Sequence, residues 1–250
     1  MTIVLVHGNP EVSAIWDDVV AELDRDDPHH DDIVCLSPPG FGAAVPDGFG
    51  STAPEYAAWL VDELERIDGP IHLVGHDWGG GHVVGALLLR PDLVASVTTD
   101  IAGCFAPGYV WHDLAQLWRA PGVGEETVAG MAAVPVADRA AMFAGLGMSQ
   151  SAAHACADAA DAMGSSILSL YRSADESVME SIGRAVADLP DKPALHVIIA
   201  TEDAYTGGPE KARHTADAWG ARVHVLDGLG HWWMMQDPAA GAAIIASIAR

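Results

Sequence analysis

The chain has little positive charge and little cysteine, and each shortage excludes a class of protein. Lysine and arginine together number 12 against 35 aspartates and glutamates, which leaves a formal net charge of −23. So acidic a chain repels polyanions, and neither nucleic acid nor an anionic membrane is an expected partner. Cys35, Cys104 and Cys156 are well separated, without Cys-x-x-Cys spacing. We therefore expect no disulfide framework and a reducing compartment.

Long apolar runs are also missing from the chain. No apolar stretch approaches the roughly 18 residues that predict a transmembrane helix. Met1 and Thr2 lead directly into a strand-like run, without the basic and apolar regions of a signal peptide. We therefore expect a cytoplasmic protein. The acidic stretch from Asp24 to Asp32, which includes two histidines, favours a solvated loop over a metal site.

Apolar runs of two lengths alternate along most of the chain. With 250 residues, half of them apolar, the chain can form one domain with a sizeable core. Short β-branched runs followed by longer amphipathic stretches are typical of a parallel sheet wrapped by helices. Thr52 and Glu55 predict a capping box at one helix start. The expected strands are 3–6, 33–36, 71–74, 97–99, 195–200 and 223–226, and the expected helices are 15–23, 54–66, 79–89, 209–219 and 238–249.

The strand pattern disappears between Cys104 and about Leu189, where alanine, methionine and glycine follow a helical spacing. This predicts a core domain of residues 1–103 and 190–250, with a helical insertion at 104–189. Ligands of open α/β sheets collect at the carboxyl ends of the strands, so the insertion would cover that edge as a lid. The alternative is a set of extra core-packing helices with no pocket beneath them.

Asp77 occupies the centre of the motif Gly75-His76-Asp77-Trp78-Gly79, between an expected strand and an expected helix. A Gly-x-Ser-x-Gly sequence in this place is a nucleophile elbow, but here aspartate replaces serine. A carboxylate can displace a leaving group from an sp3 carbon and form an alkyl-enzyme ester. The motif therefore favours that chemistry over the acyl transfer of an esterase or lipase. The neighbouring His76 is interpreted as structural.

An aspartate nucleophile requires a general base and an acid that orients the base. His231 follows the last expected strand and is the predicted base. Asp203 ends the strand before it and is the predicted orienting acid, which gives the chain order nucleophile, acid, histidine. Asp100 ends the strand beside the elbow. It is the alternative acid and is expected in the pocket.

Asn9 follows the first strand in the sequence His7-Gly8-Asn9-Pro10. Its backbone N–H and that of Trp78 are predicted to stabilise a developing oxyanion. The side-chain amide of Asn9 and the indole N–H of Trp78 are also suited to hold a departing halide. Both residues are therefore candidate ligands of a negatively charged leaving group.

Taken together, these motifs resemble the α/β-hydrolases that use an aspartate nucleophile, namely epoxide hydrolases and haloalkane and fluoroacetate dehalogenases. The resemblance implies an α/β-hydrolase fold with a helical lid and hydrolysis without a metal or organic cofactor. Because the chain begins at the family's His-Gly-x-Pro strand, a mostly parallel sheet of about six strands is expected, with the family's N-terminal strands shortened or missing. The resemblance rests on residues 7–11 with Trp16, 75–80, 90–92 and 230–238.

Residues of the lid distinguish the epoxide hydrolases of this family from its dehalogenases. Epoxide hydrolases hold the epoxide oxygen with two lid tyrosines, and Tyr171 in the pair Tyr171-Arg172 matches one of them. The place of the other tyrosine is taken by Leu114 or Ala115, so the candidate substitutes are Tyr109, Trp111 and His112.

The chain also resembles haloalkane dehalogenases, because Asn9 and Trp78 match the two halide ligands of those enzymes. Trp111 or Trp118 would supply a third halide ligand from the lid. Fluoroacetate dehalogenases fit less well, since Trp78 and Gly81 stand where they carry arginines.

We therefore expect an epoxide hydrolase that acts on a small apolar organic substrate and water. A haloalkane dehalogenase with the same Asp77, His231 and Asp203 is the alternative. A ligand-binding protein or biosynthetic helper of the same fold is less favoured. The sequence leaves open whether the protein is a monomer or a homodimer.

Overall fold

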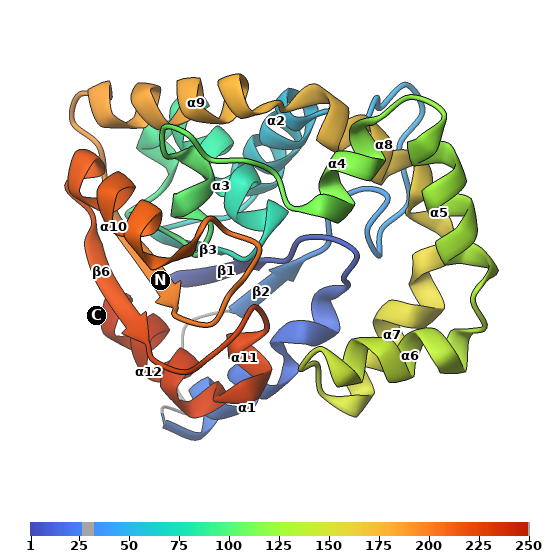
Figure 1. Cartoon of the computed structure of the whole chain (residues 1–250). Helices are drawn as coiled ribbons and strands as arrows, with labels where there is room; N and C mark the ends of the chain where they lie inside the picture. Colours follow the sequence, from blue (N-terminus) through green and yellow to red (C-terminus); the bar gives the residue numbers. More distant parts are fainter. Residues whose placement is uncertain (27–32, 250) are drawn as a thin grey trace.

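Six strands form one sheet at the centre of the molecule (Figure 1). The computed structural model describes residues 1–26 and 33–249, so residues 27–32 of the acidic stretch lie outside the described part. The strand order is β2-β1-β3-β4-β5-β6 and all five pairings are parallel, as expected. The strands are β1 (Thr2–Val6), β2 (Ile33–Leu36), β3 (Ile71–Gly75), β4 (Ser96–Thr99), β5 (Ala194–Ala200) and β6 (Arg222–Leu226).

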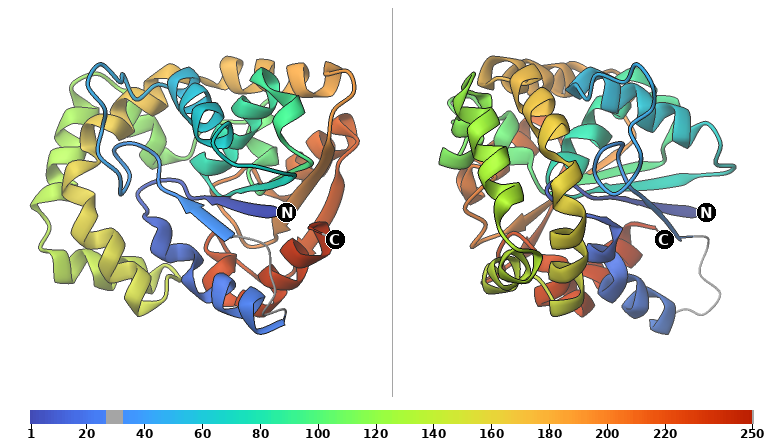
Figure 2. Two further views of the ribbon diagram at one scale, coloured as in Figure 1. Left: turned by 180° about the vertical axis from the view of Figure 1, so that it is seen from behind. Right: turned by 90° about the vertical axis from the view of Figure 1, so that its right-hand side faces the viewer.

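Helices cover both faces of the sheet (Figure 1 and Figure 2). One face carries α2 (Ala53–Leu64), α3 (Trp78–Leu89), α9 (Glu176–Asp188) and α10 (Gly208–Trp219), and the other carries α1 (Asp17–Asp26), α11 (Trp233–Gln236) and α12 (Pro238–Ile248). Successive strand residues alternate between two hydrophobic cores, with Val4 in one and Leu5 in the other, as the pleat of a strand requires. Within residues 1–26 and 33–249, no helix combines the length and hydropathy needed to cross a bilayer.

The start of α2 shows how the local sequence determines where a helix begins. The backbone N–H of Thr52 donates to the Glu55 carboxylate at 3.1 Å, which is the return bond of the expected capping box. Pro54 lies in the first turn of the helix, where its missing N–H costs no hydrogen bond. The helix therefore begins where the sequence predicts.

The segment between β4 and β5 is helical in its described residues and contains no strand. Five of its helices stand together beside the sheet (Figure 1 and Figure 2), whereas α9 packs on the core through the 2.8 Å hydrogen bond from the Trp219 indole to the Gly183 carbonyl. We use the word lid for the five helices that stand apart. They are α4 (Asp113–Arg119), α5 (Val123–Ala133), α6 (Val136–Gly145), α7 (Gln150–Ala159) and α8 (Gly164–Ser173).

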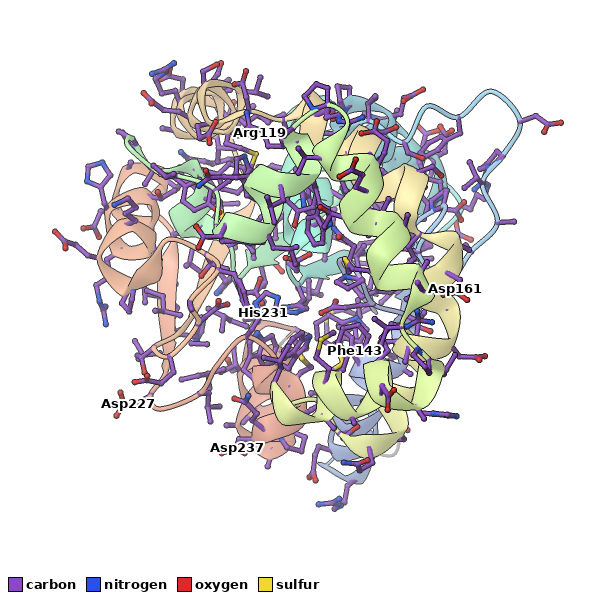
Figure 3. All side chains as sticks on the ribbon, turned by 45° about the vertical axis from the view of Figure 1, so that its right-hand side comes forward. Arg119, Phe143, Asp161, Asp227, His231 and Asp237 are labelled. Atoms are coloured by element: carbon purple, nitrogen blue, oxygen red, sulfur yellow. The ribbon has the colours of Figure 1, made fainter. Side chains whose placement is uncertain are left out.

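Arg139 holds the lower part of the lid together from within. Its side chain is only 2% exposed and donates to backbone carbonyls of Met131, Val134 and Ala157. These carbonyls belong to α5, to the connection after it and to α7. The same guanidinium pairs with the exposed Asp161 at 2.8 Å; the labelled Asp161 lies on the outer side of the lid in Figure 3.

Candidate active site

Asp77 stands at the turn from β3 into α3 in a backbone conformation that non-glycine residues rarely adopt. Its φ is 49° and its ψ is −130°, so the turn is strained. The turn requires close backbone approach, because a Cβ on Gly79 would meet the Val6 carbonyl oxygen at 2.2 Å, and one on Gly75 would meet the Gly79 oxygen at 2.4 Å. The glycines of the motif therefore allow the sharp bend that presents the aspartate.

The carboxylate of Asp77 is held on one side and open on the other. Its Oδ1 accepts a 3.0 Å hydrogen bond from the backbone N–H of Asn9, and a Cβ on Gly8 would meet the same oxygen at 2.1 Å. Burial raises the pKa of Asp77 to about 6, and the charge of Glu11 adds to the rise, while His231 opposes it. The carboxylate is thus ionised near neutral pH and poorly solvated, as a nucleophile should be.

His231 lies between two carboxylates. Its Nδ1 is 2.8 Å from Asp203 Oδ2, and its Nε2 is 3.7 Å from Asp77 Oδ2. Burial alone would lower the pKa of His231, but the carboxylate of Asp203 raises it overall. The second oxygen of Asp203 accepts from the backbone N–H of Tyr205 at 2.8 Å, which fixes the orienting acid. His231 and Phe143 of the lid, both labelled in Figure 3, line the same cavity.

Asp100, the alternative orienting acid, makes different contacts. Its carboxylate lies 2.5 Å from His76 Nδ1, accepts from the Trp233 indole at 2.8 Å, and accepts from the backbone N–H of Asp77 at 3.1 Å. The geometry therefore places Asp203, and not Asp100, on the predicted base. The expectation that Asp100 lines the pocket is corrected, because these bonds hold its side chain beneath the elbow.

A buried network below the elbow extends from Asp100 through His76 to Glu11. His76 Nε2 lies 3.1 Å from Glu11, and Glu11 also accepts from the Trp232 indole at 2.6 Å and from the backbone N–H of Gly8 at 3.0 Å. Burial would lower the pKa of His76, but the two carboxylates raise it well above its usual value. His76 is therefore a buried cation between two anions, a role that its sequence neighbours do not indicate.

Glu11, His76 and His231 also form the single group in the described part of the chain whose ligand atoms lie close enough together to hold a metal ion. Every one of these side chains is already engaged by hydrogen bonds to Asp100, to Asp203 or to one another. These three side chains thus form part of an internal hydrogen-bond network.

Unpaired polar atoms gather on the open side of Asp77. The side-chain amide of Asn9 and the indole N–H of Trp78 are buried and have no hydrogen-bond partner within 3.5 Å among the described residues, although both interact with the Tyr171 hydroxyl. Burial and then the charge of Asp77 raise the pKa of Tyr171 well above its usual value, while Trp78 and Asn9 oppose the rise. Tyr171 therefore keeps its proton and lies beside the same two donors.

The remaining lid candidates differ in whether their donors are free. The hydroxyl of Tyr109 donates to the Tyr205 carbonyl at 3.0 Å, and the indole of Trp111 donates to the Ala174 carbonyl at 3.1 Å. The indole N–H of Trp118 is buried and has no partner in the described part of the chain. Tyr109 thus braces the loop behind Asp203 and does not line the cavity where it was expected.

Two adjoining cavities meet at Asp77. The larger has a volume of about 160 Å³, and a recess of about 10 Å³ lies beside Trp78 and Trp111. Three of the residues lining the larger cavity, Leu114, Met142 and Leu146, are 38%, 49% and 49% exposed, so the cavity opens between α4 and α6. Its other walls include Trp118, Met131, Phe143 and His231, and His112, Tyr171 and Tyr205 line both spaces.

Tyr205 is a cavity residue that the sequence analysis missed. Its ring lies edge-on to His231, with centroids 5.0 Å apart, and edge-on to His112 at 5.2 Å. Its position two residues after Asp203 is the one sequence signal that could have found it. Tyrosine in a loop after a strand is too common to single out by pattern.

The sequence is similar to known hydrolases and related proteins. A sequence profile of the alpha/beta hydrolase family matches residues 3–244. The chain is 34% identical over 90 residues to a cis-3-alkyl-4-alkyloxetan-2-one decarboxylase of Xanthomonas campestris pv. campestris, a match that covers 31% of this chain and 28% of that protein. It is 31% identical over 99 residues to haloalkane dehalogenase 2 of Mycobacterium tuberculosis, which covers 38% and 32%. The matched parts are thus about a third of these relatives.

Solved structures agree over much more of the chain. Haloalkane dehalogenase DbeA from Bradyrhizobium elkanii superposes with a TM-score of 0.70 at 19% identity, covering 99% of this chain and 89% of that one. At this identity the likeness concerns the fold alone.

Proposed function

The chain belongs to the alpha/beta hydrolase family and has its fold, and from this premise we propose that it is a haloalkane dehalogenase. Asp77 would displace halide from an sp3 carbon of a small apolar substrate. His231, oriented by Asp203, would activate the water that completes hydrolysis. The partial sequence match to a haloalkane dehalogenase supports the proposal.

The observation that carries the proposal is the pair of unsatisfied donors beside the nucleophile. The amide of Asn9 and the indole of Trp78 are buried, and among the described residues neither has a hydrogen-bond partner within 3.5 Å, with only the Tyr171 hydroxyl interacting with both. A buried donor without a full hydrogen bond is costly. A halide that leaves as Asp77 attacks would accept from both. The site would then bind the departing anion more strongly than the neutral substrate, which is how binding accelerates a reaction.

The reaction would proceed in two steps. An Asp77 oxygen attacks the carbon while the carbon–halogen bond breaks and its electron pair leaves as halide, which forms an alkyl ester. His231 Nε2 then takes a proton from water, and the resulting hydroxide adds to the ester carbonyl carbon. The bond between the carboxyl carbon of Asp77 and the alkoxy oxygen breaks, the alcohol leaves with the proton of the added hydroxyl, and the Asp77 carboxylate is restored. The imidazolium of His231 releases its proton to solvent.

Epoxide hydrolysis, which the sequence favours, is the second candidate. Tyr171 supports it, because its protonated hydroxyl stands beside Asp77 and could protonate the alkoxide of an opened epoxide. We place it second because the hydroxyl of Tyr109 and the indole of Trp111 are both bonded to backbone carbonyls. The second lid donor of that reaction must therefore come from elsewhere.

The two candidates are distinguished by assaying halide release from bromoalkanes and chloroalkanes, and diol formation from terminal epoxides. An alkyl oxetanone belongs in the same panel because of the relative named above. In a single turnover in heavy-oxygen water, an ester mechanism transfers an oxygen of Asp77 to the first product. Incorporation of solvent oxygen in that turnover would contradict it. His231→Gln should accumulate an alkyl adduct on Asp77, detectable by intact mass spectrometry.

A further inference from the structure

The loop that carries His231 is held by side chains on two sides. On the core side, the indoles of Trp232 and Trp233 donate to buried carboxylates below the elbow. On the other side, Gln236 at the end of α11 folds back along the loop, and its Oε1 accepts the backbone N–H of Gly230 at 2.7 Å. Gln236 therefore fixes the residue that directly precedes the predicted base.

Gln236 also contacts the lid, at the turn between α6 and α7 (Figure 1). A Cβ on Gly147 in this turn would meet the side-chain nitrogen of Gln236 at 2.5 Å. The φ of Gly147 is 113°, a backbone conformation that favours glycine. Beside it, the backbone N–H of Ser149 donates to the sulfur of Met235 at 3.4 Å. The turn of the lid thus packs directly on the end of the loop that holds the base.

The same turn borders the mouth of the larger cavity. Leu146, which lines the mouth, is the chain neighbour of Gly147. Gly147 contacts Gln236, and Gln236 is bonded to Gly230. Gly230 is in turn the chain neighbour of His231. Three links, each a covalent neighbour or a close contact, therefore connect the end of α6 to the base.

The position of the base depends on this loop more than on the nucleophile. Nε2 of His231 lies 3.7 Å from Asp77 Oδ2, which is too long for a hydrogen bond. Asp203 holds the ring at Nδ1 alone, and one hydrogen bond lets the ring tilt. The backbone of the loop therefore determines where Nε2 stands when water attacks the ester.

We propose that Gln236 is a positioning residue for the base. It holds Gly230, and through it His231, in the orientation that activates water, and it does so while the α6–α7 turn of the lid rests on it. The inference rests on the proposed function and holds for an ester formed from either a haloalkane or an epoxide. It assigns the lid a part in the second step of the reaction, in addition to enclosing the substrate.

Gln236→Ala tests the first part of the proposal. The side chain is exposed, so the variant should fold. Ester hydrolysis should slow on the order of 10²-fold, the cost of a misplaced catalytic group, while alkylation of Asp77 changes little. An adduct on Asp77 should then accumulate, which rapid quench and intact mass spectrometry detect. Equal slowing of the two steps would overturn the proposal.

Gln236→Glu is the conservative variant, because its carboxylate keeps an acceptor for the Gly230 N–H. It should hydrolyse the ester faster than Gln236→Ala. A defect as large as that of alanine would show that the bond to Gly230 is not what positions the base.

Gly147→Ala tests the part played by the lid. The added methyl group displaces the Gln236 amide, so ester hydrolysis should slow in the wild-type background. In Gln236→Ala the contact is already lost, and the same substitution should have no further effect. Penalties that add in the double variant would show that the turn does not act through Gln236.

Gly122→Ala is the matched control, since Gly122 is also in the lid and has a φ of 81°, but a Cβ there would meet nothing within 4 Å. It introduces the backbone strain without the contact. It should lower the melting temperature and leave ester hydrolysis unchanged. Slowing like that of Gly147→Ala would show that strain in the lid is sufficient, and would contradict the proposal.

Hydrogen exchange of the Gly230 N–H, followed by NMR, tests the linkage without turnover. Exchange should be faster in Gln236→Ala and in Gly147→Ala than in the wild type, and unchanged in Gly122→Ala. Unchanged exchange in Gly147→Ala would overturn the proposal whatever the enzyme hydrolyses. Failure of the proposed function is recognised separately, as the absence of both halide and diol with the wild-type protein.

Discussion

The ring of His76 lies 4.6 Å from the ring of His231, centre to centre. His76 is held as a cation by two buried carboxylates, and its charge lowers the pKa of His231. We expect His76→Gln to raise the pKa of His231, because one positive charge is lost while both carboxylates remain.

The base must be neutral to take a proton from water, so the acid limb of kcat should move to higher pH in His76→Gln. A pH profile of kcat measures the shift, with melting temperature recorded in parallel. An unshifted limb in a folded variant would show that the charge of His76 does not act on the base.

Asp203 and Asp100 should respond differently to the same substitution. Asp203→Asn removes the charge that orients and stabilises His231, so kcat of the folded variant should fall about 10²–10⁴-fold. Asp100→Asn breaks a buried ion pair with His76, and such a break costs about 3–5 kcal/mol. Steady-state kinetics and denaturant unfolding of both variants test this contrast. If Asp100→Asn lost more activity than Asp203→Asn while folded, the orienting role would belong to Asp100.

Burial raises the pKa of Asp77 to about 6, and this shift predicts how activity and folding stability depend on pH. The nucleophile must be ionised, so kcat/KM should fall as pH drops below this value. The raised pKa also means that ionisation destabilises the fold: the penalty is absent below the unfolded pKa of about 4 and complete above the folded pKa.

Asp77→Asn should therefore be more stable than the wild type by about 1–3 kcal/mol near pH 8, a difference that shrinks as pH falls from about 6 to 4. Unfolding by urea at several pH values measures it. A stability difference that is constant with pH would show that the Asp77 carboxylate is not desolvated.

The lid should depend on Arg139 far more than on its ion-pair partner. Arg139→Met leaves the carbonyls of Met131, Val134 and Ala157 without the donors they now have, and each lost bond to a charged group is worth about 1.5–3 kcal/mol. Asp161 is 62% exposed, so Asp161→Asn should cost less than about 1 kcal/mol. Limited proteolysis between α5 and α7 reports the opening of the lid. Equal sensitivity of the two variants would assign the stabilisation to the ion pair.

Strand positions and the elbow could be predicted from sequence because they depend on local pattern. The six expected strands all overlap observed ones, since short β-branched runs have few other uses in a soluble domain. The elbow motif places Asp77 because glycine spacing, strand and helix coincide there. The expected lid of residues 104–189 included α9, which instead packs on the core through distant partners such as Trp219. A local sequence pattern does not show such partners.

The hydrogen-bond partners of the site could not be obtained in the same way. Glu11 and Asp100 are 89 positions apart in the sequence, yet both contact His76. Whether a tyrosine or indole donor is free depends on one carbonyl within reach, as with Tyr109 and Trp111. Such contacts depend on rotamers and on the closure of the fold, which periodicity does not describe.

The glycines around the elbow restrict how this enzyme can diversify. A Cβ at Gly8 would meet the Asp77 carboxylate at 2.1 Å, and a Cβ at Gly75 or Gly79 would meet a backbone carbonyl oxygen at 2.4 or 2.2 Å. Substitutions at these glycines are therefore excluded. Residues at the mouth between α4 and α6 are half exposed and meet no such barrier. Libraries that aim at new substrates should therefore randomise Leu114, Met142 and Leu146 and leave the elbow unchanged.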